Sequence, residues 1–312
     1  MPKVSVIITT HNRPHLLRQA IESAKAAGAD IELIVVDDAS TDDTSNVCRE
    51  LSGIRYVRVE RNQKVAGARN IGILASTADY ISFLDDDDVR FPGSLDFQLA
   101  ALEAEPAAGL VYAQAMVENQ KDPQSNFLYP SHPQAGDIFW LLLSQNFIPC
   151  GSVVFRRSCL SSIGLLDADI PGIDDWDLWI RIAEVYPVIA LSRPVMTWRG
   201  STPISKQGTS RASELVTLST RQFQREWMQL PRAAGATRIQ RREAWQRFSA
   251  NMAKHLVSET ITALQYRCFI QAQRHLNTLL RLHPAGLMWA IGKSSKFRFL
   301  SQTGTNVQNP NS

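Results

Sequence analysis

The first half of the chain alternates short apolar runs with stretches whose apolar residues recur at helical spacing. The apolar runs are rich in β-branched residues and cover residues 4–10, 32–38, 54–60, 80–85 and 109–118. The helical stretches between them begin at Pro14 and Ser40 and then span 66–76 and 92–105. This order is typical of βαβ units, whose parallel strands are covered by helices. It predicts an α/β domain with a mostly parallel central sheet flanked by helices.

Polar residues follow three of these runs, at the point where each predicted strand ends. They are Thr9–Asn12, Asp37–Asp38 and Asp85–Asp88. Ligands of open α/β sheets bind at the carboxyl ends of the strands, so we expect these residues to converge on one crevice. Farther along, the sequence pattern predicts a polar loop over 119–136, a strand over 151–157, a helix over 173–184 and a strand over 188–199.

The four adjacent carboxylates of Asp85–Asp88 cannot all stay ionised without a cation or a basic partner nearby. Mg²⁺ and Mn²⁺ prefer oxygen ligands and combine one or two protein carboxylates with phosphate and water. The run therefore indicates a divalent metal site. An exposed acidic turn that begins the next helix is the alternative interpretation, since Asp favours helix N-termini.

Three shorter signals point to a nucleotide and a catalytic base. Asp37 ends an apolar strand, where its carboxylate can accept the ring N–H of a pyrimidine; hydrogen bonds from nearby backbone N–H groups are the alternative. Arg69 begins a helix and can pair with phosphate or with the acidic strand ends. Asp174 and Asp175 lie at the positive end of a predicted helix, which favours an ionised base. Simple capping of that helix by Asp174 is the alternative.

The charges divide the chain into two unlike parts. Residues 1–204 hold 17 basic and 26 acidic residues, and the rest hold 16 basic and 4 acidic residues. We therefore expect an acidic domain over 1–204, a basic helical segment over 205–300 and a disordered polar tail over 301–312.

The basic segment has three candidate roles: packing on the acidic domain, peripheral contact with an anionic membrane, and nucleic-acid binding. No DNA or RNA motif is recognisable in it, so we expect no nucleic-acid partner. Its aromatic residues suit either a helical core or a lipid interface; they are Trp227, Trp245, Trp289 and Phe297.

The four cysteines have neither CxxC spacing nor a histidine cluster beside them, which argues against a zinc site and a disulfide framework. The chain begins on a strand pattern without a cleavable leader, and it has no run of 18 apolar residues. These features predict a cytoplasmic location. The basic segment would also allow peripheral attachment to the inner face of a membrane.

Five motifs, taken in this order, resemble those of the family 2 glycosyltransferases, which have the GT-A fold. They are VSVIITTHNR, ELIVVDDAST, GARNIG, YISFLDDDD and DDWDLWIRIA, and they lie between residue 3 and about residue 200. The resemblance implies an inverting enzyme that moves a sugar from a nucleotide-diphosphate donor, usually a UDP-sugar, to an acceptor hydroxyl. It implies a role in polysaccharide, glycolipid or glycoconjugate synthesis, with a glycan or a lipid-linked glycan as acceptor.

The resemblance also implies roles for individual residues. For the nucleotide-sugar site it indicates Thr9, His11, Asn12, Asp37, Arg69, Asp85 and Asp86. Asp87 corresponds to the metal ligand of the DxD motif, so a divalent cofactor, Mn²⁺ or Mg²⁺, is expected. The run of four aspartates allows more than one register of that motif.

The general base corresponds to Asp175, with Asp174 and Trp176 beside it as acceptor-contacting or supporting residues. Two positions depart from the family's pattern. Asp174 stands where a Glu is usual, and Ser201 stands where a His often lies, so no metal or diphosphate role carries over to residue 201.

Two other functions fit parts of the pattern. A nucleotidyltransferase would carry a glycine-rich basic loop after the first strand, where this chain has THNRPH. A non-catalytic scaffold or nucleotide-binding protein would not need Asp175 together with Asp37, Asp85 and Asp87. Both therefore fit less well than a metal-dependent glycosyltransferase.

Overall fold

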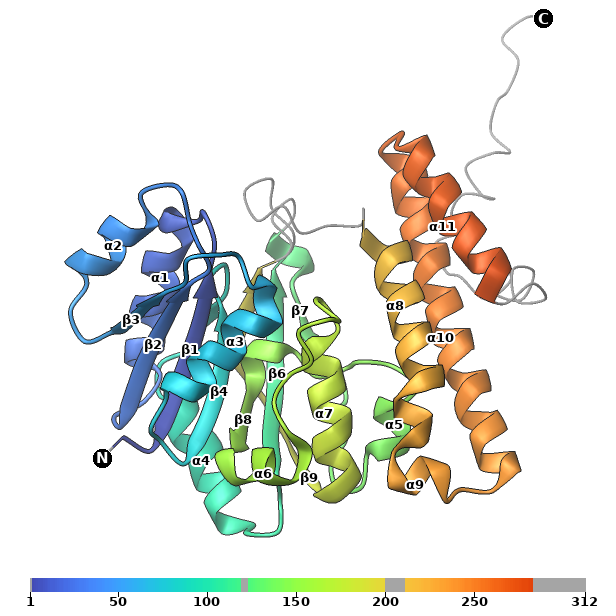
Figure 1. Cartoon of the computed structure of the whole chain (residues 1–312), viewed down its shortest axis with the longest axis horizontal. Coiled ribbons are helices and arrows are strands. Elements are labelled where there is room, and N and C mark those ends of the chain that lie inside the picture. The colour runs from blue at the N-terminus through green and yellow to red at the C-terminus, as the bar shows by residue number, and fades with distance from the viewer. Residues whose placement is uncertain (1, 119–122, 200–210, 283–312) are drawn as a thin grey trace, which may run out of the picture. The chain divides into compact units, whose positions relative to one another are not determined.

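The computed structural model describes residues 2–118, 123–199 and 211–282. The chain divides into two compact units, one of Met1–Leu142 and Asn146–Gln207, the other of Leu143–Gln145 and Gly208–Ser312. The first contains the sheet, and the described part of the second is helical (Figure 1). The predicted boundary at residues 204 and 205 and the predicted tail over 301–312 lie outside the described residues.

In the described part of the chain, nine strands form one sheet in the order β3-β2-β1-β4-β8-β6-β9-β5, with β7 paired to β6. The strands are β1 (Val4–Thr10), β2 (Ile31–Asp37), β3 (Arg55–Arg58), β4 (Tyr80–Asp85), β5 (Val89–Arg90), β6 (Leu110–Glu118), β7 (Phe127–Tyr129), β8 (Val153–Arg156) and β9 (Val188–Arg199). The helices of this unit are α1 (Pro14–Ala26), α2 (Thr44–Glu50), α3 (Lys64–Ala75), α4 (Ser94–Ala104), α5 (Phe139–Leu142), α6 (Leu160–Ile163) and α7 (Asp174–Val185).

The first half of the sheet is parallel, as predicted. β1 pairs in parallel with β2 and with β4, and β2 pairs in parallel with β3. Alternate residues of β1 face opposite sides: Val6 and Ile8 join a buried cluster with α1 and α4, whereas Ile7 faces α3. Helices therefore cover both faces of the sheet (Figure 1).

The second half of the sheet is more mixed than the sequence predicts. β8 is antiparallel to both β4 and β6, and β5 is antiparallel to β9, while β6 and β9 are parallel. Parallel neighbours need a long crossover, usually a helix. α4 provides one between β4 and β6, but the described chain between β6 and β8 contains only short helical pieces, so β8 inserts between those strands in the antiparallel sense.

Strand register brings the predicted polar ends together. Thr10 pairs with Asp37 and Thr9 pairs with Asp85 across β1, β2 and β4. The convergence of three strand ends on one edge of the sheet is therefore confirmed.

Two predicted elements differ from the structure. The helix expected from Ser40 begins at Thr44, because the preceding residues are held by other contacts: Asn12 N donates to Ser40 Oγ (2.9 Å), and Thr41 N donates to Asn12 Oδ1 (2.8 Å). The loop expected over 119–136 contains β7, which pairs with β6. Three residues are too few to show the alternation by which strands are recognised.

The described part of the helical unit consists of α8 (Ala212–Arg225), α9 (Pro231–Ala234), α10 (Arg238–Gln265) and α11 (Phe269–Leu282). Its core contains Phe223 stacked on Phe248, with ring centroids 4.5 Å apart, and the indole of Trp227, which is 1% exposed. Trp245 packs against both phenylalanines. Trp227 is thus a core residue and not a lipid contact, Trp245 is half-buried against the core, and Trp289 and Phe297 lie outside the described residues. Among the described helices, none combines the length and apolarity that a bilayer span requires.

Gly72 sets the distance between α3 and β1. A Cβ atom added at Gly72 would overlap the Cγ2 atom of Ile7. Alanine stabilises a helix interior by about 1 kcal/mol relative to glycine, whereas overpacking a core costs about 1–3 kcal/mol or more. The steric contact with Ile7 should therefore decide whether a substitution of Gly72 by alanine raises or lowers the free energy of unfolding.

We expect Gly72→Ala to lower the free energy of unfolding of the wild-type chain and to raise it in an Ile7→Ala background, where the overlapping side chain is gone. Urea unfolding of the four proteins measures both effects. An equal effect in the two backgrounds would show that Ile7 does not set the helix-to-strand distance.

Candidate active site

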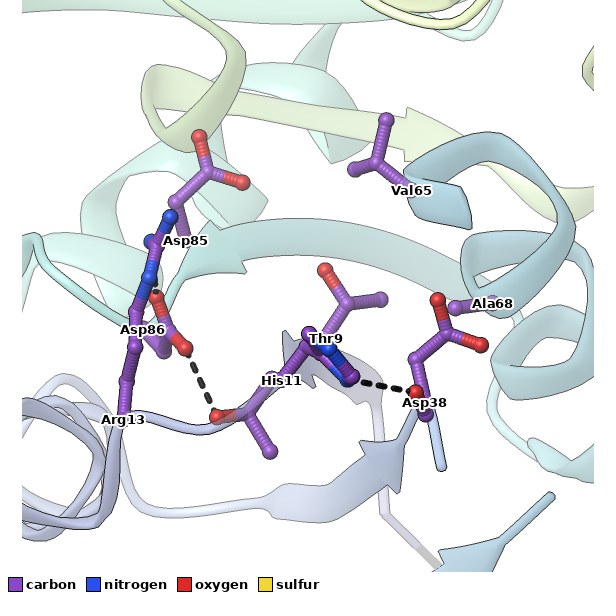
Figure 2. A pocket seen from close by; sticks show the side chains of 9 residues that line it. Thr9, His11, Arg13, Asp38, Val65, Ala68, Asp85 and Asp86 are labelled. Carbon is purple, nitrogen blue, oxygen red and sulfur yellow. Dashed lines mark hydrogen bonds and ion pairs between the residues drawn. The ribbon is translucent and has the colours of Figure 1, made fainter. Parts of the chain in front are cut away.

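A first cavity of about 140 Å³ lies where β1, β2 and β4 end. It is lined by Thr9, Thr10, His11, Arg13, Asp38, Val65, Ala68, Asp85 and Asp86 (Figure 2). Val65 and Ala68 come from the first turns of α3, and the other residues end the three strands or follow them directly. Of the residues predicted for the nucleotide-sugar site, Thr9, His11, Asp85 and Asp86 line this cavity.

Asn12 supports the first cavity without lining it. Its φ of 55° is in the left-handed region, which Asn adopts more readily than most residues. Its amide Nδ2 donates to His11 Nε2 (3.1 Å), while His11 Nδ1 donates to the carbonyl oxygen of Asp38 (2.7 Å). Asn12 thus helps to fix the orientation and tautomer of the His11 ring.

The two adjacent aspartates at the end of β2 have different surroundings. Asp37 is 0% exposed, and its carboxylate accepts hydrogen bonds from Ser40 N (2.8 Å) and the Tyr56 hydroxyl (2.6 Å). Asp38 lines the first cavity and accepts from Gln63 N (2.6 Å), and burial raises the pKa of its carboxyl. The structure therefore places Asp38, and not the predicted Asp37, where a carboxylate can meet a ligand in this cavity.

The run of four aspartates separates into one braced carboxylate and a cluster of three. Asp86 accepts from Thr10 Oγ1 (2.7 Å) and pairs with Arg13 Nη1 (2.9 Å) (Figure 2). Burial raises the pKa of Asp86 to about 7, although the charge of Arg13 opposes that shift. Asp86 is thus fixed to the end of β1 and the start of α1, and it lies outside the cluster of three.

The cluster consists of Asp85, Asp87 and Asp88, which offer carboxylate oxygens that all lie within 4.8 Å of one another. Burial, followed by the charge of Asp85, raises the pKa values of Asp87 and Asp88. A divalent cation would relieve this repulsion, and carboxylate oxygen is the ligand that Mg²⁺ and Mn²⁺ prefer. The cluster therefore fits the expected metal, and it includes the predicted ligand, Asp87, together with Asp88, which the predicted site omitted.

Arg69 joins the strand-end aspartates to the start of α7. Its buried guanidinium donates to Asp85 (2.7 Å) and to Asp174 (2.8 Å) and lies over the ring of Phe83, 5.3 Å from the centroid. The guanidinium of Arg69, which we expected near the nucleotide, is thus bound to two carboxylates, and Arg69 lines neither the first cavity nor the second. Its position is that of a support for the acidic residues.

A second cavity, of about 210 Å³, lies on the other side of Asp85. It is lined by Asp85, Asp88, Tyr129, Asn146, Ile148, Pro149, Cys150, Gly151, Gly172, Asp175, Met196 and Trp198. Asp85 lines both cavities, so a ligand that fills the first can extend past this carboxylate into the second. The predicted base, Asp175, thus lies in the same cavity as two members of the acidic cluster.

Asp175 lies in the first turn of α7, where its carboxylate accepts from Trp176 N (2.7 Å). Burial, followed by the negative charge of Asp174, raises the pKa of Asp175 to about 7. A carboxylate with this pKa can take a proton near neutral pH, which is the property that general-base catalysis requires.

Asp174 and Trp176 do not line the second cavity. Asp174 is buried, pairs with Arg69 and accepts from Gly172 N (2.9 Å). The Trp176 indole donates to the carbonyl oxygen of Leu142 (2.7 Å). Both therefore hold the start of α7 in place, which fits the supporting role and not the acceptor-contacting role expected for them.

The sequence analysis did not predict an aromatic pair that lines the second cavity. The rings of Tyr129, in β7, and Trp198, near the end of β9, have centroids 5.9 Å apart. The Tyr129 hydroxyl donates to the carbonyl oxygen of Asn146 (3.1 Å), which fixes the ring. The two residues are 69 positions apart, so no local sequence pattern indicates that they meet.

Sequence comparison relates the chain to known glycosyltransferases. Residues 5–164 match the sequence model of glycosyl transferase family 2. The uncharacterized glycosyltransferase YwdF of Bacillus subtilis is 29% identical over 193 residues, which are 60% of this chain and 70% of that protein. WfaP of Escherichia coli, named as a UDP-Glc:alpha-D-GlcNAc-diphosphoundecaprenol beta-1,3-glucosyltransferase, is 29% identical over 187 residues, which are 58% of this chain and 70% of WfaP.

An uncharacterized glycosyltransferase of Rickettsia felis is 29% identical over 195 residues. The match covers 60% of this chain but 32% of that relative, so the chain spans about a third of its length.

Solved structures are similar over almost the whole chain. S. aureus TarS 1-349 in complex with UDP-GlcNAc has a TM-score of 0.60 at 16% identity, covering 99% of this chain and 93% of that one. The mannosyltransferase PcManGT of Pyrobaculum calidifontis, in complex with GDP-Man and Mn²⁺, has a TM-score of 0.53 at 20% identity, covering 94% and 88%. These likenesses show the GT-A fold. Because the family match extends over more than half of the sequence, the chain belongs to glycosyl transferase family 2.

Proposed function

We propose that this glycosyltransferase moves a sugar from a UDP-sugar to an acceptor hydroxyl, with inversion at the anomeric carbon and with a divalent cation. The observation that carries the proposal is the shared position of Asp85. It lines the first cavity, at the strand ends where nucleotides bind in open α/β sheets, and the second cavity, which contains Asp175. A donor and an acceptor bound in these cavities would meet beside this carboxylate.

The first cavity fits the nucleoside end of the donor. Asp38 offers a carboxylate that can accept the ring N–H of uracil, and Thr9 and His11 add polar side chains beside it. TarS was solved with UDP-GlcNAc, and the name of WfaP specifies a UDP-glucose donor. Both support UDP as the nucleotide of this chain, whereas PcManGT was solved with GDP-Man.

The cluster of Asp85, Asp87 and Asp88 would hold Mn²⁺ or Mg²⁺. When bound, the cation would neutralise charge on the departing diphosphate. Arg13 Nη1 lies 3.4 Å from Asp87 and so holds one carboxylate of the cluster in place, while it also pairs with Asp86 beside the cluster. Arg69 holds a second carboxylate of the cluster, that of Asp85.

Asp175 would take the proton of the acceptor hydroxyl as that oxygen attacks the anomeric carbon. Attack from the face opposite the leaving group inverts the configuration. The Tyr129 and Trp198 rings give the second cavity an apolar wall on which the ring of an acceptor sugar can lie.

A lipid-linked glycan is the acceptor class that the name of WfaP supports for this chain. Such an acceptor would place the reaction at a membrane, and we propose the cytoplasmic face, with the basic helical segment as the part that contacts anionic lipid. Non-catalytic nucleotide binding fits less well, because it would leave no role for Asp175 in the second cavity.

Calorimetric titration with UDP and with uridine tests the metal site. We expect Mn²⁺ to strengthen binding of UDP and not of uridine, because uridine has no phosphate oxygens to which the cation could bind. Asp87→Asn should remove that gain and leave uridine binding unchanged. Loss of both would mean that Asp87 maintains the first cavity itself, and an unchanged metal effect would place the cation elsewhere.

Substitution of the neighbouring aspartates distinguishes Asp38 from Asp37. Asp38→Asn should weaken uridine binding by about 10-fold or more, since it replaces one of the acceptor oxygens facing the ligand. Asp37→Asn should instead lower the free energy of unfolding by about 1–3 kcal/mol, because it disturbs a buried hydrogen-bonded carboxylate. Uridine titration and urea unfolding of both variants measure the two effects, and the reverse pattern would restore Asp37 as the ligand-binding residue.

The pH dependence of transfer tests the base. The pKa of Asp175 lies near 7, above its ordinary value, so its carboxyl is protonated and inactive below that pH. We expect kcat to rise with pH, to reach half of its plateau at about pH 7 and to level off about one to two pH units higher, with a lower midpoint if a bound cation stabilises the carboxylate. Asp175→Asn should lower kcat by about 10²–10⁴-fold and keep UDP binding. Asp169→Asn, an exposed aspartate outside both cavities, is the matched control, and an equal loss in it would contradict the assignment.

A further inference from the structure

The end of the chain has a one-sided charge. Glu259 is the last acidic residue, and the following 53 positions include six basic residues, Arg267, Arg274, Arg281, Lys293, Lys296 and Arg298. Within the described residues, the segment 260–282 carries Arg267, Arg274 and Arg281 and no carboxylate side chain, so its exposed face attracts anions.

The turn between α10 and α11 is well defined by backbone hydrogen bonds. Cys268 N donates to the carbonyl oxygen of Ala263 (2.8 Å), and Arg267 N donates to that of Leu264 (3.0 Å). This is the Schellman pattern, with Arg267 at the left-handed position, where its φ is 58°. α11 begins two residues later, so the turn holds its side chains in fixed positions.

Four large apolar or aromatic side chains extend from this turn into solvent. Leu264 is 48% exposed, Tyr266 61%, Phe269 65% and Ile270 71%. We call these four residues the tip surface. Burying them against another surface would remove apolar area from water.

The tip surface continues along α11. Leu276 and Leu280 lie seven and eleven positions after Phe269 and are 37% and 43% exposed, so all three share one helix face. The neighbouring face carries the exposed arginines Arg274 and Arg281. An apolar stripe beside a row of arginines is the pattern of helices that lie in a membrane interface, where long basic side chains reach the headgroups.

We propose that the tip surface and the outer face of α11 bind the surface of an anionic lipid bilayer. The exposed rings and aliphatic side chains enter the interface, and Arg267, Arg274 and Arg281 contact the phosphate headgroups. The absence of acidic residues after Glu259 favours lipid over a protein partner, because protein surfaces present both signs of charge. The proposal gives a location to the membrane contact included in the proposed function, but the binding itself does not require glycosyl transfer.

Sedimentation of the full chain with lipid vesicles tests this. Phosphatidylcholine vesicles with about 30% phosphatidylglycerol should bind the wild type, and pure phosphatidylcholine vesicles should bind it far more weakly. Raising NaCl from about 0.1 M to about 0.5 M should release bound protein. The double variant Phe269→Ser, Ile270→Ser should weaken binding by about 10-fold or more.

Ile239→Ser provides a matched control. Ile239 is 71% exposed, as Ile270 is, but it lies at the opposite end of α10, about 40 Å away along a 28-residue helix. This variant should bind vesicles like the wild type. Equal weakening by the two sets of substitutions, or no binding of folded wild type to anionic vesicles, would overturn the proposal and leave a protein partner or residues 283–312 as the occupant.

Uridine titration of the same proteins separates this proposal from the proposed function. The double variant should bind uridine as the wild type does, since both substitutions lie outside the two cavities. Vesicle binding without uridine binding would support the lipid surface and contradict the UDP-sugar donor. The opposite result would contradict the lipid surface alone.

Discussion

The site depends on one buried cation, the guanidinium of Arg69. Its two ends donate to Asp85 at the end of β4 and to Asp174 at the start of α7, and its flat face lies over Phe83. Burial alone would lower the pKa of Arg69, but the neighbouring acidic groups, Asp85 and Asp174 among them, raise it well above its ordinary value. Arg69 thus fixes the distance between the end of β4 and the start of α7. Removing one partner of a buried ion pair costs about 3–5 kcal/mol, so loss of this side chain would destabilise both ends.

The same contact explains how so many carboxylates can lie close together. Asp85, Asp87, Asp88, Asp174 and Asp175 would repel one another strongly if nothing compensated for their charge. Arg69 neutralises one side of the group and Arg13 the other, and the remaining repulsion is the force that a divalent cation would relieve. Below this layer, Phe83, Phe155 and Trp179 pack edge to face or tilted, so the polar site lies on a rigid apolar base.

Local sequence pattern predicts much of this architecture, because strand alternation and helical spacing are properties of neighbouring residues. The parallel order of β1, β2 and β4, the convergence of their ends and the position of Asp175 in a helical first turn all follow from such patterns. The pattern could not predict in which direction each side chain at a strand end points. Adjacent residues at a strand end face opposite sides, so the sequence could not decide which of Asp37 and Asp38 meets the first cavity.

Long-range contacts account for the other differences. Arg69 is 105 positions from Asp174, and Tyr129 is 69 positions from Trp198, so nothing local shows that either pair meets. The antiparallel position of β8 between β4 and β6 likewise depends on the path of the chain that connects β6 to β8, and not on the residues of β8 itself. These contacts are set by tertiary packing, and they include the ion pair that holds the start of α7 beside Asp175 and the aromatic wall of the second cavity.

The absence of a side chain at Gly72 affects the shape of the first cavity. Val65, Ala68 and Gly72 follow one another at spacings of three and four, so they share one face of α3, and the first two line the first cavity. The close approach of Gly72 to Ile7 therefore determines how near this face comes to the end of β1. The depth of the first cavity is thus set from beneath, by a contact in the core, and a substitution at that contact would change the shape of the cavity without altering any polar group that lines it.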